Sequence, residues 1–512
     1  MGSKEGAEER TRGPAKPRRA ASAAAASAAA ASAAAALANP PTAALEFGGP
    51  VGAACCTALM PAAVFLLERL LAAPAPGLAD PLASEDRPPR PLPSPAKGFL
   101  DPRAALYFAA WMAFVAAMYY FPWRREVEGV PLRDGKRLKY NANAVCTLGV
   151  TLAVAAAVTY CHGPAPLVDV YDRIPGLIVA SVICADPSSS RARDPPVLTG
   201  RTRLRPSPRP DDPALPYNYN STQFFMGREL NPRIGSLDLK YVCELRPGLI
   251  GWVVINLAAA AKQFQQAGRI TDSMFLTILF QLWYVADSHI SEQTNGDRFV
   301  PRALQKSVLT TMDITTDGFG FMLTFGDLVR PANRPSGRIR HWQTSVFLTP
   351  IARDSKVWVP FTYSLQARYL AVHPVDLGNG MALLVTLVNF LGYGIFRGAN
   401  KQKDLFRSRP DCEASKAMTY ITTKTGSKLI TSGWWGMARH INYLGDWIMG
   451  LAWCLPCGLP AFPAVPYFYA AYFAGLLFHR QRRDDEKCAR KYGGDWERYC
   501  RIVKWRIIPG VY

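Results

Sequence analysis

The chain has 512 residues, of which 49% are hydrophobic and 19% charged, and its formal net charge is +20. A disordered chain would be less hydrophobic, and an ordinary soluble domain carries about 25% charged residues. Because proline- and arginine-rich stretches alternate with long uncharged runs, the composition predicts a membrane protein with several spans. A nucleic-acid-binding protein is the competing explanation of the charge.

Residues 1–45 are predicted to be disordered. A head of mixed charge leads into an Ala/Ser tract at 20–38, which is too weakly apolar for a membrane span. The tract also lacks the leucine-rich core of a secretory signal.

From residue 46 onward, apolar runs predict an all-α fold, a polytopic bundle of transmembrane helices. The run at 104–123 has twenty residues without a charge, enough for a helix to cross about 30 Å of hydrocarbon. The apolar segment at 174–184 is too short to cross alone. About eight to ten spans are expected, from candidates at 51–67, 104–123, 144–161, 247–261, 274–286, 308–328, 357–372, 381–396, 443–457 and 461–478.

Polar stretches at 186–216, 287–307 and 329–356 interrupt this pattern and are interpreted as insertions. Irregular backbone at membrane depth would leave polar groups unsatisfied in lipid unless protein covers it. These segments are therefore expected to loop out of the bilayer or to be shielded.

Two basic segments predict the orientation. The loop at 397–433 has eight Lys/Arg and three Asp/Glu, and the tail at 479–512 has ten and five, so each contributes +5. The positive-inside rule places both on the cytosolic face, and the two apolar segments between them are consistent with that. Half of the net charge thus faces lipid headgroups and cofactor phosphates, and no nucleic-acid partner is expected.

The apolar middle of the chain contains carboxylates. Asp313 and Asp317 are four residues apart and would share one helix face, with Asp287 and Asp327 flanking them. A carboxylate at membrane depth is costly and marks a functional candidate, unless it lies at an interface or pairs with an arginine. A buried carboxyl group can hold a proton and donate it to a substrate.

Tyr363 and Tyr443 are further potential proton donors, although aromatic residues near span ends often anchor at the interface. The basic loop and tail combine cations with aromatic residues, a pattern that suits phosphates and flat rings or, alternatively, anionic lipid headgroups. The glycines at 392, 394 and 398 miss the dinucleotide-binding spacing. Cys454 and Cys457 are interpreted as core thiols, and no metal site is predicted.

Eight motifs in order make the sequence recognisable: GRELNPR (227–233), ELRPG (244–248), DGFGF (317–321), PFTYSLQ (360–366), FRGAN (396–400), SGWWG (432–436), RHINYLGD (439–446) and KYG (491–493). Over about residues 45–512, apart from the insertions, the chain resembles the sterol reductase family. That family includes delta14- and delta7-sterol reductases and the membrane half of the lamin B receptor. The start LEFGGP (45–50) is most similar to vertebrate delta14-sterol reductases.

The resemblance implies an enzyme of the endoplasmic reticulum membrane, with the nuclear envelope as a second location. It would reduce the delta14 double bond of a sterol intermediate with NADPH, by protonation of the alkene and hydride transfer. The NADPH contacts that it implies lie within 397–512: Lys403, Arg407, Ile430, Trp435, Asn442, Tyr443, Asp484, Cys488, Ala489, Arg490, Lys491, Tyr492 and Tyr499. The proton is expected from Asp313 or Asp317, with Tyr363 or Tyr443 nearby.

The chain departs from the family pattern at Thr316, where histidine is usual, and at Ile441, where proline or a bulky residue is usual. Two alternatives stay open. One is a structural protein of the nuclear envelope similar to the lamin B receptor, although its N-terminal reader domain has no counterpart here. The other is a membrane enzyme similar to isoprenylcysteine methyltransferase, against which the motifs at 227–248 and 313–366 argue.

Overall fold

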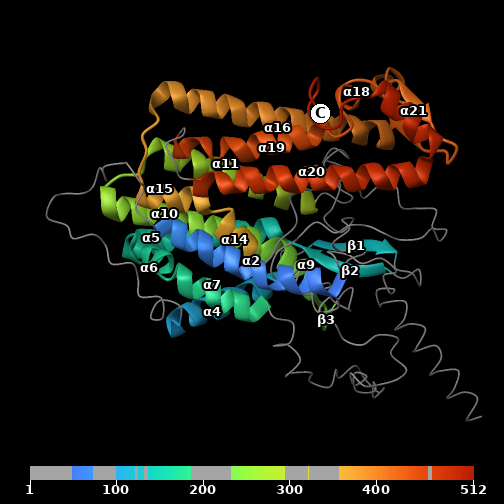
Figure 1. The fold of residues 1–512 in the computed structure, drawn as a ribbon. Coiled ribbons are helices and arrows are strands. Elements are labelled where there is room, and N and C mark those ends of the chain that lie inside the picture. The colour runs from blue at the N-terminus through green and yellow to red at the C-terminus, as the bar shows by residue number, and fades with distance from the viewer. Residues whose placement is uncertain are drawn as a thin grey trace, which may run out of the picture.

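The computed structural model describes residues 49–72, 100–121, 125–131, 137–185, 232–293, 321, 357–458 and 464–512. These parts of the chain are mostly helical, and the long helices run roughly side by side (Figure 1). The predictions for 1–45, 186–216 and 329–356, and those for Asp313 and Asp317, lie outside the described residues.

In the described residues up to 185, the helices are α2 (Gly49–Ala72), α4 (Pro102–Tyr119), α5 (Ala144–His162), α6 (Ala165–Asp172) and α7 (Ile174–Ala185). Helix α4 begins where expected, because Asp101 caps it by accepting a hydrogen bond from the Arg103 amide at 2.9 Å. It ends at Tyr119, four residues before the predicted end of the apolar run.

Three antiparallel hairpins in the described part of the chain correct the all-α expectation: β1 (Arg125–Pro131) with β2 (Arg137–Ala142), β3 (Arg233–Ile234) with β4 (Leu237–Asp238), and β5 (Tyr420–Thr422) with β6 (Lys428–Ile430). They form in polar connections between helices, where hydropathy carries no signal for a strand. Each hairpin is a separate two-stranded sheet, so the helices still carry the fold.

The central helix is continuous through three elements: α9 (Leu239–Leu245), the π-helical turn η3 (Arg246–Ile250) and α10 (Gly251–Ala267). Helix α11 (Asp272–Gln293) follows and runs seven residues beyond the expected end of its apolar run at 286. The segment predicted as one span at 357–372 is instead two short helices, α14 (Trp358–Thr362) and α15 (Leu365–Val372), which meet at Tyr363 and Ser364.

The C-terminal part contains α16 (Gly378–Ser408), α17 (Glu413–Lys416), α18 (Trp434–Met437), α19 (Ile441–Ala452), the 3₁₀ turn η6 (Leu455–Cys457), α20 (Ala464–Tyr492) and α21 (Gly494–Ile502). Helices α16, α19 and α20 lie alongside one another, with α18 and α21 at one end (Figure 1). Helix α16 extends through the first third of the predicted basic loop, so Lys403 and Arg407 are helical residues.

Two glycines let α16 and α19 touch at their backbones. A methyl group on Gly445 would lie 2.5 Å from the Phe396 amide nitrogen, and one on Gly392 would lie 2.7 Å from the Gly445 carbonyl oxygen. Small residues allow this close approach in membrane helix pairs. Gly392 therefore serves the packing of α16 on α19, which is a different role from that of a glycine in a dinucleotide-binding motif.

Four helical stretches in the described residues are long and apolar enough to cross a membrane: Val51–Leu71, Ala144–His162, Leu239–Ala267 and Gly378–Arg407. The apolar window of Leu239–Ala267 is 88% buried, whereas that of each other stretch is 22% buried. The central helix is thus enclosed by the others, and its residues form much of the main hydrophobic core. A polytopic helical membrane protein accounts for this arrangement.

Candidate functional site

The first part of the candidate site lies where α16 meets α18 and the β5–β6 hairpin. The Lys403 ammonium lies 3.9 Å from the centroid of the Trp435 ring, and the Trp435 indole donates a hydrogen bond to the Ala399 carbonyl at 2.8 Å. Ile430 packs on Trp435 together with Phe406. Three of the predicted cofactor residues therefore meet here, and a buried cation lies on an aromatic face.

The second part lies at the first turn of α19. Tyr443 donates a hydrogen bond from its hydroxyl to the Asp484 carboxylate at 2.9 Å, and Arg480 lies 5.7 Å from the centre of its ring. The preceding Asn442 is buried, and its Oδ1 has no hydrogen-bond partner among the described residues. The predicted residues of α19 and α20 are thus in direct contact.

Cys488 connects these two parts. Burial raises the pKa of its thiol to about 12, with Asp484 adding to the rise and Lys403 opposing it. Lys403 on α16 and Asp484 on α20 therefore act on the same thiol. The cofactor residues predicted on α16, α18, α19 and α20 therefore form one cluster.

The remaining predicted cofactor residues lie at the end of α20 and in α21, except Arg407, which lies on α16. Tyr499 is buried beside Trp496, with ring centroids 5.1 Å apart, and Trp496 stacks on Tyr492 at 6.4 Å. Burial raises the pKa of Tyr499. By contrast, the side chains of Arg407, Ala489, Arg490 and Lys491 are exposed. These four are placed around the cluster and not within its core.

Sequence reasoning did not identify a charge network that surrounds Asp485. This carboxylate accepts from Gln481 at 2.6 Å and from Arg439 at 3.3 Å, and it lies 3.5 Å from the Arg506 guanidinium. Burial alone would raise the pKa of Asp485, but the hydrogen bond from His440 and the charge of Arg439 hold it below its ordinary value. Asp485 is therefore an anion held among Arg439, His440 and Arg506.

The same network attaches the last residues of the chain to the start of α19. The Arg439 amide donates to the Trp505 carbonyl at 2.9 Å, and the His440 amide donates to the Arg506 carbonyl at 2.7 Å. Arg439 also donates from its side chain to the Val503 carbonyl at 2.9 Å. These bonds fix the turn from which Asn442 and Tyr443 project.

A cavity of about 560 Å³ lies next to this cluster, on the adjacent face of α16. Gly398, Lys401, Gln402, Leu405, Met418, Gly433, Trp434 and Met437 line it. None of them is a predicted cofactor residue, although Trp434 adjoins Trp435 and Gln402 adjoins Lys403. Gln402 accepts the Trp434 amide at 2.8 Å and so holds α18 against α16.

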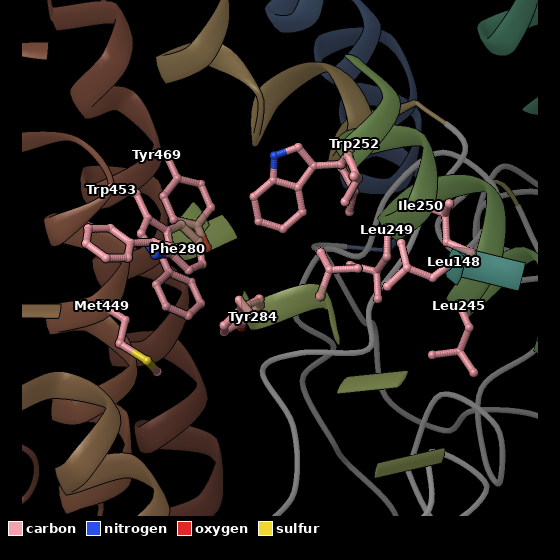
Figure 2. Close-up of a cluster of buried hydrophobic side chains, with 14 of the residues drawn as sticks. Leu148, Leu245, Leu249, Ile250, Trp252, Phe280, Tyr284, Met449, Trp453 and Tyr469 are labelled. Atoms are coloured by element: carbon pink, nitrogen blue, oxygen red, sulfur yellow. The ribbon is translucent and has the colours of Figure 1, made fainter. Parts of the chain in front are cut away.

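At its other end, α19 leads into a ring cluster of five aromatic residues. These are Trp252 of α10, Tyr284 of α11, Tyr469 of α20, Trp453 directly after α19, and Tyr363 between α14 and α15. The ring centroids lie 4.8 Å apart for Tyr284 and Trp453, 4.6 Å for Tyr363 and Tyr469, and 5.4 Å for Trp252 and Tyr363. Figure 2 shows Trp252 and Tyr284 between the Trp453–Tyr469 group and the aliphatic side chains of Leu148, Leu249 and Ile250. The predicted donor Tyr363 thus lies in this cluster.

Asp446 lies between the cofactor cluster and the ring cluster. It is 1% exposed, and neither carboxylate oxygen has a hydrogen-bond partner among the described residues. Asp446 is the last residue of the motif RHINYLGD, and the sequence alone assigns it no role. The signal was its position, because Asp446 follows Tyr443 by three residues and therefore shares a helix face with it.

Among the acids singled out from the sequence, Asp287 is described and is ion-paired with Arg397 of α16. Tyr393 also donates to Asp287, at 3.4 Å. Of the two interpretations, a functional carboxylate or one paired with an arginine, the second applies to Asp287.

The interpretation of Cys454 and Cys457 as core thiols is confirmed. Cys454 and Cys457 are buried, and their thiols donate to the backbone carbonyls of Pro466 and Gln366. All eleven cysteines are free. Within the described residues, no group of three or more histidine, cysteine or acidic side chains is placed to bind a metal.

Comparison with known proteins gives the family. The profile of the ergosterol biosynthesis ERG4/ERG24 family matches residues 43–332 and 352–512. The delta(14)-sterol reductase erg24 of Schizosaccharomyces pombe is 44% identical over 414 residues, which cover 80% of this chain and 86% of the relative. The delta(14)-sterol reductase TM7SF2 of Mus musculus is 42% identical over 484 residues, which cover 92% and 98%.

A third relative, the delta(14)-sterol reductase of Ascobolus immersus, is 41% identical over 477 residues, covering 91% of this chain and 99% of the relative. The break in the family match, at 333–351, falls within the segment 329–356 that the sequence sets apart. The resemblance to sterol reductases that the eight motifs predict is confirmed. With nearly the whole sequence matched, this chain belongs to the ERG4/ERG24 family of sterol-biosynthesis proteins.

Proposed function

We propose that this protein reduces the delta14 double bond of sterol intermediates, using NADPH, in the endoplasmic reticulum membrane. Relatives named delta(14)-sterol reductases, 41–44% identical over most of the chain, support the reaction. The structural observation that supports the proposal most strongly is that α19 runs from one candidate binding region to another. It connects a polar cluster suited to a dinucleotide with an apolar ring cluster suited to a sterol.

The residues of the polar cluster fit a phosphorylated dinucleotide. A buried lysine lies on an indole ring, and the buried Asn442 Oδ1 lacks a partner that an amide or hydroxyl group of a ligand would supply. Lys403 and Arg407 provide cations that would favour the 2′-phosphate of NADPH over NADH. Bound NADPH would supply the hydride, and Lys403, Trp435, Asn442 and Tyr443 would hold it beside α19.

An isolated alkene accepts a hydride poorly until a proton has added to it. The enzyme therefore needs a dry slot for the sterol and an acid inside it. The sequence candidates for this acid are Asp313 and Asp317, which are outside the described residues, together with Tyr363 and Tyr443. Tyr363 lies among the rings, whereas the hydroxyl of Tyr443 is engaged with Asp484.

The proposed topology keeps eight to ten spans, of which four helical stretches meet the length and hydropathy of a full crossing. The basic loop and the tail would face the cytosol. Residues 397–512 would form the part that binds NADPH, and the remainder of 46–396 would supply most of the sterol slot. The lipid bilayer and the sterol are the expected partners.

Expression in yeast that lacks its own delta14-sterol reductase, followed by sterol profiling, tests the proposal. Delta14-unsaturated sterols should disappear when this chain is present in the membrane fraction. Their persistence at a normal protein level would contradict delta14 reduction. A fall in delta7-unsaturated sterols alone would assign the enzyme to the other double bond.

Replacement of Lys403 by methionine gives a matched control for the cofactor. The apolar part of the side chain would remain on Trp435, but the charge would be lost. Purified Lys403→Met protein should bind NADPH more weakly, by about tenfold or more for a lost charged contact, while its affinity for NADH changes little. An equal loss for both nucleotides would contradict 2′-phosphate recognition by Lys403.

A further inference from the structure

A buried carboxylic acid without a partner is unusual enough to require a cause. Most buried polar side-chain atoms in native proteins have a hydrogen-bond partner, yet both oxygens of Asp446 lack one among the described residues. The polar groups that act on it are the hydroxyl of Tyr284, which is placed to donate a hydrogen bond, and the charge of Arg480. It is 1% exposed, so bulk water does not compensate for the missing bonds.

The position of Asp446 is imposed by the backbone around it. Gly445, the residue before it, lies against the backbone of α16 and leaves no room for a side chain. This contact prevents α19 from turning, so Asp446 stays on the face that carries Tyr443, Met449 and Trp453. The contact at Gly445 therefore keeps the carboxyl group of Asp446 in the core, although no ion pair among the described residues compensates for its burial.

The surroundings of Asp446 are aromatic. Trp453 lies seven residues later on the same face of the helix, its ring centroid 4.8 Å from that of Tyr284 and 5.4 Å from that of Tyr469. Asp446 also acts electrostatically on Tyr469. The faces of aromatic rings attract cations, and the attraction is stronger away from water. A cation formed beside Asp446 would therefore meet ring faces.

We propose that Asp446 is held as a neutral carboxylic acid and donates its proton to the sterol double bond, while the ring cluster stabilises the carbocation that results. This inference rests on the proposed function and deepens it. An ionised carboxylate isolated from water is so costly that such a group takes up a proton instead. A neutral acid at this depth has a proton to give to a substrate.

The proton transfer balances in the following way. The O–H bond of Asp446 breaks and its electron pair stays on the oxygen, while the π electrons of the alkene form the new C–H bond and leave a tertiary carbocation. The hydride of the proposed reaction then reduces this cation. Asp446 regains a proton from water, by way of the Tyr443–Asp484 pair one turn earlier on α19.

Infrared spectroscopy of the full-length purified protein, without any ligand, tests the protonation state directly. Wild-type protein at neutral pH should show the carbonyl band of a protonated carboxylic acid, shifted in D₂O. Asp446→Asn should lack this band. Asp238→Asn should retain it, because Asp238 is a buried acid that is already paired with Arg233 and caps α9. A wild-type spectrum without the band, or a band that survives in Asp446→Asn, would overturn the proposal.

Sterol turnover provides the second measurement. Asp446→Asn should lower kcat by about 10²- to 10⁴-fold, the usual contribution of a general acid, with NADPH affinity unchanged within about threefold. Asp446→Glu retains a carboxyl group and should recover part of the rate. A raised KM for the sterol with an unchanged kcat would make Asp446 an anchor for the substrate and would overturn its role as an acid.

The two proposals fail in different ways. If wild-type protein reduces no sterol, the proposed function is wrong, while the infrared band still reports whether Asp446 is protonated. If wild-type and Asp446→Asn proteins reduce delta14-unsaturated sterols at equal rates, the function stands and the role of Asp446 is refuted.

Discussion

Asp446 on α19 and Asp485 on α20 are acidic residues of two adjacent helices, and they differ in the partners that surround them. Asp485 is surrounded by Arg439, His440, Arg506 and Gln481. Asp446 is more deeply buried and has no hydrogen-bond partner among the described residues. The difference indicates which acid serves stability and which serves chemistry, because a folded chain tolerates an uncompensated polar group mainly where function requires it.

The largest expected effect on stability comes from the buried cation of the Asp485 network. Arg439→Met should lower the free energy of unfolding by about 3 kcal/mol, since it removes the buried partner of a carboxylate and the donor to the Val503 and Lys504 carbonyls. Thermal unfolding in detergent measures this. Arg506→Met is the matched control and should cost about 1 kcal/mol or less, because its side chain is 44% exposed. Equal losses for the two variants would contradict the contrast in burial.

Next in size is the contact that fixes Asp446 in place. Gly445→Ala would put a methyl group 2.5 Å from the Phe396 amide nitrogen, so α16 and α19 would have to separate. Overpacking of this kind costs about 1–3 kcal/mol. The variant should unfold at a lower temperature and should also lose sterol turnover, because Asp446 would move. Gly475→Ala, on α20 with no heavy atom within 4 Å of the added carbon, is the control and should change neither.

Removing the negative charge from each acid in turn should change the stability of the protein by different amounts. Asp485→Asn should lower the free energy of unfolding by about 1–2 kcal/mol, because its ion pairs are lost. Asp446→Asn should leave stability within about 0.5 kcal/mol of wild type, since it removes no ion pair and keeps an oxygen that can accept from Tyr284. A destabilisation of Asp446→Asn as large as that of Asp485→Asn would show that the structure depends on a bond from Asp446.

The smallest effect is the dependence of stability on pH. The pKa of Asp485 is lower in the folded protein than in the unfolded chain, where it is about 3.9. Its contribution is therefore fully present above that value and is lost as the pH falls through the lower, folded pKa. The stability difference between wild type and Asp485→Asn should be constant from about pH 7 to 5 and should shrink below pH 4. A difference that grows on acidification would contradict this sign.

The sequence alone predicts that the chain is helical and membrane-embedded, and it also predicts the family. Both predictions depend on long apolar runs and short motifs, which consist of consecutive residues. The sequence was insufficient for the hairpins, which form in polar connections with no apolar alternation. It also missed the break in the helix at Tyr363 and Ser364, since both sides of the break are equally apolar.

At the site, the residues that take part were easier to predict than the contacts between them. Lys403 with Trp435 and Tyr443 with Asp484 were named as cofactor residues, and the fold brings each pair together. The network around Asp485 and the isolation of Asp446 depend on which side chains from distant elements are present or absent nearby. No local pattern contains that information, and only the packing of α11, α16 and α20 around α19 reveals it.

The most direct test of the account compares delta14-sterol reduction by purified Asp446→Asn and Asp485→Asn proteins, each with NADPH binding measured in the same preparation. The account predicts that Asp446→Asn binds NADPH normally and turns over about 10²- to 10⁴-fold more slowly than wild type. Asp485→Asn should turn over within about tenfold of wild type at a temperature where it is folded. Near-normal turnover by Asp446→Asn, or a greater loss in Asp485→Asn, would contradict the assignment of chemistry to one acid and stability to the other.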